Sequence, residues 1–146
     1  MKGCSVGVSE AATLALHAAI FLANAPAGQA SSREMAAALS VSEAHLSKVL
    51  NRLAKAGILH STRGPSGGFS LQRPPEAITL LEVYEATEGP FHSPTCLWET
   101  PKCGRVGCLL GELMHEVNAR IHEVLSATTL AHPGLSWEPP PEAETP

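Results

Sequence analysis

The sequence contains no aspartate, so its 14 acidic residues are all glutamates. Aromatic residues are scarce as well, at 4% of 146 residues, while 44% are hydrophobic and mostly aliphatic. A chain of this length can bury one modest core, and leucine and alanine favour helices. No apolar run reaches the ~20 residues of a membrane span, and the start lacks the apolar block of a secretory signal. We therefore expect one mainly α-helical, cytoplasmic domain.

Residue patterns typical of enzymes are also missing. The sequence has no C-x-x-C redox pair, no glycine loop for phosphate, and no arrangement of serine, histidine and acid suited to nucleophilic catalysis. We therefore expect a binding protein rather than an enzyme.

The formal net charge of −4 hides an uneven distribution along the chain. Residues 1–32 sum to zero, residues 33–73 carry six basic and two acidic side chains, and residues 74–146 carry three basic side chains against eleven glutamates. The middle segment is therefore basic inside an acidic protein. A phosphate backbone responds to the local potential, so this segment is the candidate nucleic-acid surface.

Apolar residues at helical spacing predict five helices, at residues 9–23, just after Ser31, 43–56, 79–89 and 108–131. Ser31 with Glu34, and Thr79 with Glu82, stand in capping-box relation, and Ser42 can cap the third helix. Gly57 sits where a left-handed residue would end that helix. Residues 58–62 and 68–71 flank RGPSGG and predict a two-stranded ribbon.

Two short helices, a capped third helix and a glycine-rich ribbon predict a winged helix-turn-helix. The third helix has the width to enter a major groove, and Arg63 in the ribbon can reach a narrow minor groove. The alternative is that these are ordinary solvated charges around a helical hairpin. The candidate DNA-binding residues are Ser42, His45, Ser47, Lys48, Arg52, Lys55, Arg63, Ser66 and Gly67.

The last predicted helix is apolar over more of its circumference than a lone surface helix needs. Pairing with a second copy is the economical interpretation, and packing back on its own domain is the alternative. The proline-rich, acidic residues 133–146 predict a disordered tail. The expected organisation is a DNA-binding domain at 1–75, a connecting helix and cysteine loop at 76–106, a dimerisation helix at 107–132, and the tail.

Residues 5–132 resemble the IscR/NsrR family of bacterial winged-helix regulators. The resemblance rests on SEAATLALHAAIFLA, on VSEAHLSKVLNRLAKAGILHSTRGPSGGFSLQRP, and on a cysteine loop before a long terminal helix. It implies a homodimer held by the long helices and binding to operator DNA. Where three cysteines are present, it also implies an iron–sulfur cluster that controls DNA affinity.

Three of the four cysteines, Cys96, Cys103 and Cys108, have the spacing C-x6-C-x4-C. Soft thiolates on a flexible loop suit an iron–sulfur cluster. The family pattern is nearer C-x5-C-x5-C, which leaves open whether the cluster is 2Fe-2S or 4Fe-4S. Structural zinc and bare redox thiols are the alternatives, although zinc sites usually show C-x2-C pairs that are missing here.

Such clusters usually take four protein ligands, so one remains to be found. One branch of the family has a histidine three residues after its third cysteine, where this chain has Gly111. Other branches use the first helix of the partner subunit, at the positions of Thr13 or His17, which implies His17 as the fourth ligand. A packed core histidine is the alternative role for His17. Weaker ligand candidates are Glu10 and His115, and Cys4 is expected to be spare.

The sequence thus predicts a DNA-binding transcriptional regulator, expected to be a repressor, whose operator affinity is controlled by a cluster that senses redox state, nitric oxide or iron. The alternative is a cluster-free winged-helix regulator that uses thiol oxidation, a small molecule or a protein effector.

Overall fold

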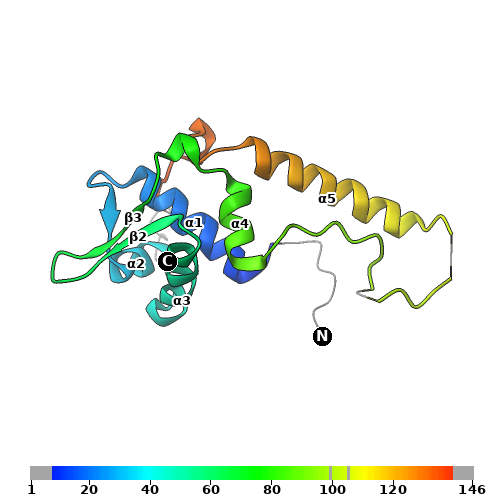
Figure 1. Ribbon diagram of the computed structural model, residues 1–146, viewed down its shortest axis with the longest axis horizontal. Coiled ribbons are helices and arrows are strands. Elements are labelled where there is room, and N and C mark those ends of the chain that lie inside the picture. Colours follow the sequence, from blue (N-terminus) through cyan, green and yellow to red (C-terminus); the bar gives the residue numbers. More distant parts are fainter. Residues whose placement is uncertain (1–7, 99, 105, 140–146) are drawn as a thin grey trace, which may run out of the picture.

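The computed structural model describes residues 8–98, 100–104 and 106–139. Figure 1 shows a compact body from which one long helix projects. The helices are α1 (Glu10–Asn24), α2 (Ser32–Leu39), α3 (Glu43–Lys55), α4 (Leu80–Glu88) and α5 (Leu109–Ala127), the strands are β1 (Gln29–Ala30), β2 (Leu59–Thr62) and β3 (Gly68–Leu71), and the 3-10 helices are η1 (Pro75–Ala77) and η2 (Pro133–Leu135). The predicted mainly α-helical winged-helix fold is confirmed.

Side-chain caps fix where the helices begin. The hydroxyl of Ser31 accepts a hydrogen bond from the Glu34 amide, and the Glu34 carboxylate accepts one from the Ser31 amide at 2.7 Å, which completes the predicted capping box. That amide hydrogen bond holds the pKa of Glu34 below its usual range. Thr79 and Glu82 form the second predicted box at the start of α4.

The core lies where α1, α3 and α4 meet the inner face of the sheet. The predicted apolar face of α3 is buried: Leu46, Leu50 and Leu53 are fully enclosed and Val49 nearly so. Facing them, α1 buries a side rich in small residues, which lets its backbone approach α3 and α4 closely. The buried residues of α1 are Ala12, Leu14, Ala15, Ala18, Ala19 and Leu22.

The sheet has three antiparallel strands in the order β1-β3-β2, one more than the predicted ribbon. The additional strand, β1, lies between the first two helices, where the sequence patterns predicted no strand. It pairs Gln29 with Ser70 and Ala30 with Phe69. Gly68 permits this pairing, because a Cβ atom at that position would lie 2.6 Å from the carbonyl oxygen of Ala30.

The chain beyond α4 differs from the prediction at two points. α5 ends at Ala127 rather than continuing to residue 131, because Thr129 forms an antiparallel bridge with Thr79 and Leu130 enters the core. The prediction that residues 133–146 form a disordered tail is wrong for residues 133–139, which include η2 and pack on α1. Residues 140–146 lie outside the described residues.

No helix in the described ranges is both long enough and apolar enough to cross a membrane.

Candidate functional site

The candidate DNA-binding side chains lie on α3 and on the loop between β2 and β3. Ser42 uses its hydroxyl to cap α3, accepting from the His45 amide at 3.4 Å. Lys48 and Lys55 are exposed, while Ser47 is half-buried. Lys48 lies in the first half of α3, and Lys55 is its last residue.

Two of the predicted DNA-binding residues also make contacts inside the protein. Arg52 donates to the carbonyl oxygen of Thr87 at 3.4 Å, in the last turn of α4, where helix carbonyls lack partners of their own. His45 Nδ1 lies 3.8 Å from a carboxylate oxygen of Glu10 on α1. Both contacts join α3 to the helices behind it, and sequence patterns gave no signal for either pairing.

The loop between β2 and β3 forms a narrow wing. Arg63 and Ser66 are exposed there, and the Gln29 side chain donates to the Ser66 carbonyl at 3.2 Å. Gly67 is required by this turn, because a Cβ atom would lie 2.2 Å from the carbonyl oxygen of Thr62. Gln29 is a supporting residue that sequence reasoning missed, because its contact depends on strand β1.

The three cysteines lie on the segment between α4 and α5. Cys96 and Cys108 are half-buried and Cys103 is exposed. Cys108 is the N-cap residue of α5. Within the described residues, no three histidine, cysteine or acidic side chains gather closely enough to hold a metal ion. The single chain therefore presents the thiols without assembling a site.

Gly111 lets the cysteine segment run directly against α5. A Cβ atom there would lie 2.3 Å from the carbonyl oxygen of Thr95, so every other residue type is sterically excluded in this conformation. A histidine at this position, as in one branch of the family that the sequence resembles, would not fit between α5 and the Thr95 segment in this conformation.

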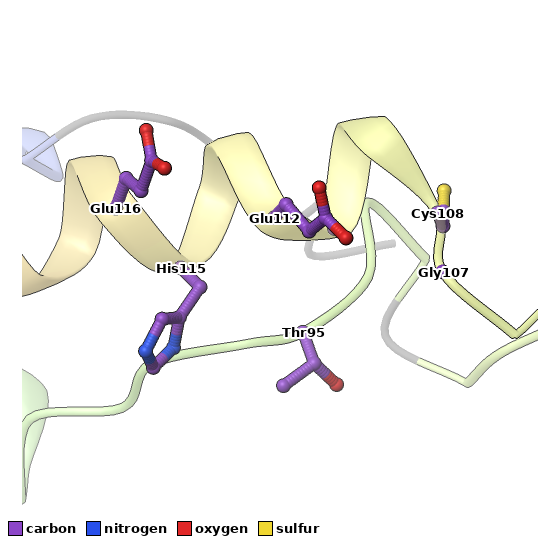
Figure 2. A pocket seen from close by; sticks show the side chains of 7 residues that line it. Thr95, Gly107, Cys108, Glu112, His115 and Glu116 are labelled. Atoms are coloured by element: carbon purple, nitrogen blue, oxygen red, sulfur yellow. The ribbon is translucent and has the colours of Figure 1, made fainter.

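Beside Gly111 is an open hollow of about 500 Å³, lined by Thr95, Cys108, His115 and two glutamates of α5. Figure 2 shows His115 beside the segment that carries Thr95, with Glu112 and Glu116 on neighbouring turns. The His115 ring lies 3.5 Å from the hydroxyl of Ser93. One predicted thiol ligand, Cys108, and the weaker candidate His115 both line this hollow, about two helical turns apart and at opposite ends of it.

His17 is exposed on α1, so it is not a packed core histidine. Its Nδ1 lies 2.7 Å from the carbonyl oxygen of Thr13. Because a carbonyl only accepts hydrogen bonds, the neutral form of the ring has its proton on Nδ1 in this contact and its lone pair on Nε2. Histidines that bind metals are often oriented by a backbone carbonyl in this way.

His17 and the cysteines lie far apart within one chain. α1 is part of the compact body, whereas the cysteine segment extends past the far end of α5 (Figure 1). The exposed Glu10, one turn before Thr13, faces His45 instead. The structure therefore does not bring His17 or Glu10 to the cysteines of the same chain.

α5 leaves a broad apolar stripe in contact with solvent. Leu109 is 77% exposed, and Leu110, Leu113 and Val124 are exposed by 50%, 51% and 42%. Successive 100° steps along the helix place these four side chains within an arc of about 100°. Only the adjacent face, with Met114 and Leu125, is buried in the chain itself.

Comparison with known proteins gives a consistent family. The Rrf2 family model, described as an iron-dependent transcriptional regulator, matches residues 8–132. The transcriptional regulator NsrR of Geobacillus kaustophilus is 35% identical over 107 residues, which are 68% of this chain and 69% of the relative.

Two solved structures are similar over most of the chain. The global cysteine regulator CymR of B. subtilis has a TM-score of 0.70 and 30% identity, covering 85% of this chain and 92% of that one. IscR of T. potens has a TM-score of 0.65 and 25% identity, covering 86% and 83%.

The close approach at Gly111 makes a testable prediction. Gly111→Ala should force the Thr95 segment away from α5, lowering the free energy of unfolding by about 1–3 kcal/mol and speeding hydrogen exchange in residues 91–98. Glu112→Ala, an exposed change on the next residue, is the matched control and should change neither quantity. Equal exchange in both variants would show that the segment does not depend on this contact.

Proposed function

The chain belongs to the Rrf2 family of transcriptional regulators, and from this premise we propose a homodimeric repressor whose operator affinity depends on an iron–sulfur cluster. The cluster is held by Cys96, Cys103 and Cys108 of one chain and by His17 of the partner subunit. The observation that carries this proposal is the exposed His17 ring, with its proton held on Nδ1 by Thr13 and its Nε2 lone pair free to bind iron.

The donor set fits a cluster better than it fits zinc. The three thiols are accessible and carried by a segment that contains glycine and proline, so they can close around a bulky group. Glycine at position 111 cannot act as a ligand, and His17 lies too far from the cysteines of its own chain. A site shared between two chains avoids both problems, because the partner subunit can approach the far end of α5.

The apolar stripe on α5 supplies the reason to dimerise. Leu110, Val117 and Val124 repeat at seven-residue spacing, which is the pattern of a helix that pairs with another helix. Burial of these side chains stabilises the pair at about 25 cal/mol per Å² of apolar area removed from water. The same pairing brings each cysteine segment toward the other chain.

DNA binding is assigned to α3 and the wing. We propose that Ser47 meets base edges in the major groove, Lys48 and Lys55 meet backbone phosphates, and Arg63 and Ser66 meet the adjacent minor groove. His45 and Arg52 have a second role, because their contacts with Glu10 and Thr87 connect α3 to α1 and α4. When the partner's cysteine segment releases His17, α1 can shift, and the contacts that hold α3 against α1 change with it.

When bound, the cluster supplies a group that responds to oxidation, nitric oxide or iron supply. The chain's own residues transmit that response to α3. Cys96 follows shortly after α4, whose last turn accepts from Arg52, and His17 lies two turns from Glu10, which faces His45. The contacts that lead from Cys96 and from His17 both end on α3. Loss of ligation therefore changes the placement of the paired α3 helices.

The second candidate is a regulator that uses the thiols directly. It is favoured by one observation: in the part of the chain that the structure describes, the three cysteines are accessible but not gathered. Anaerobic purification separates the two functions. A brown dimer with stoichiometric iron and sulfide supports the cluster, and a colourless dimer whose DNA affinity follows thiol oxidation supports the alternative.

His17→Ala should change the visible and electron paramagnetic resonance spectra of the anaerobically loaded dimer, because one ligand is lost, while gel filtration still gives a dimer. His60→Ala removes an exposed histidine on β2 and is the matched control, expected to leave the spectra unchanged. If both variants keep the wild-type spectra and redox response, His17 is not a ligand.

Lys48→Ala should weaken operator binding and lower the slope of log affinity against log salt concentration by about 0.9, because one phosphate contact is lost. Lys102→Ala removes a lysine that lies 4.5 Å from the Trp98 ring, outside the proposed surface, and should leave the slope unchanged. Fluorescence anisotropy of both variants, in one cluster state, measures the slopes. A wild-type slope for Lys48→Ala would remove Lys48 from the interface.

A further inference from the structure

Residues 133–139, here called the strap, fold back from the end of α5 onto α1. The family match ends at residue 132, so the strap is an addition to the part of the chain that the family describes. In Figure 1 the segment after α5 returns from the long helix toward the compact body. The chain just before the strap is anchored, because Leu130 is buried and its amide donates to the Ile78 carbonyl at 3.0 Å.

Two contacts hold the strap on α1. The Asn24 side chain donates to the Leu135 carbonyl at 3.0 Å, and Leu135 packs against the core. Trp137 meets Phe21 in an edge-to-face arrangement, with the ring centroids 5.3 Å apart and the planes at 75°. Such a geometry is favourable beyond the burial of apolar area, so the contact is specific rather than a loose covering.

Both contact residues lie on the face of α1 that carries His17. Phe21 is four residues after His17 and Asn24 is seven residues after it, so the three side chains follow one another along one side of the helix. Helical side chains lean toward the N-terminus, which directs the Phe21 ring toward the turn of His17. The strap thus covers the turns that follow His17 and leaves the histidine itself exposed.

We infer that the strap, through Trp137, positions α1 so that His17 is presented to the cysteine segment of the partner subunit. The inference rests on the proposed cluster. Trp137 is a positioning residue: it acts through Phe21 on the turn that carries His17. Residues 128–132 join α5 to the strap, so the same contact links this turn of α1 to the helix that we propose to form the dimer.

The first test needs no cluster. In the cluster-free dimer, Trp137→Ala should speed hydrogen exchange in residues 17–24, while Trp137→Phe, which keeps an aromatic edge against Phe21, should stay near wild type. Glu138→Ala changes the next, exposed residue and is the matched control. Unchanged exchange in Trp137→Ala overturns the inference, whatever the protein binds.

The second test uses the loaded dimer and iron chelation. Trp137→Ala should release iron about threefold to tenfold faster than wild type, in line with the loss of one aromatic pair, and Trp137→Phe should restore slow release. In a His17→Ala background, Trp137→Ala should add nothing, because residues that act through one another are not additive. An equal increase in both backgrounds overturns the role through His17.

The two tests separate the strap from the proposed function. If the wild-type dimer takes up no iron and sulfide, the proposed function fails and the presentation of His17 to a cluster fails with it, while the exchange result still decides whether Trp137 orders α1. If the wild type loads and Trp137→Ala releases iron at the wild-type rate, the proposed function stands and the inference is overturned.

Discussion

The burial of one alanine-rich face of α1 is the interaction on which the rest of the structure depends. Ala15, Ala18 and Ala19 are completely buried, and side chains of this size let α1 lie close to both α3 and α4. Larger residues would force the helices apart. Since this face is buried, the opposite face of α1 is turned to solvent, and that face carries Glu10, Thr13 and His17.

The two helices packed on α3, α1 and α4, connect the proposed cluster site to the DNA-binding surface. α1 holds a histidine whose tautomer is set by its own backbone, α4 holds the start of the cysteine segment, and both helices contact the recognition helix. The DNA-binding surface and the candidate ligands therefore share one rigid support. A change in ligation at His17 acts directly on a packed helix, and packed helices shift as units.

Sequence patterns predicted the features that depend on residues close together in the chain and missed those that depend on distant residues. The capping boxes at Ser31 and Thr79 and the left-handed Gly57 were confirmed, because they are decided by residues within a few positions of one another. Strand β1 was missed, because its two residues gain their structure only from β3. The end of α5 was placed too late for the same reason, since Thr129 pairs with the distant Thr79.

The strap and the candidate site also depend on contacts between residues far apart in the sequence, which sequence patterns do not show. A proline-rich, acidic composition predicts disorder, and the contacts of Trp137 with Phe21 and of Asn24 with Leu135 override it for residues 133–139. The exposure of His17 and the packing of Gly111 against Thr95 both required the fold. The meeting of the cysteines with His17 stays a prediction, because the proposed site needs two chains and the structure describes one.

A mixed dimer tests the central claim that each site is shared between chains. One chain carries His17→Ala with its cysteines intact, and the other keeps His17 but has Cys96, Cys103 and Cys108 changed to alanine. If the fourth ligand comes from the partner subunit, this dimer contains one complete site, and its visible and electron paramagnetic resonance spectra should be those of the wild type at half the iron content. Spectra identical to those of the His17→Ala homodimer would contradict the account.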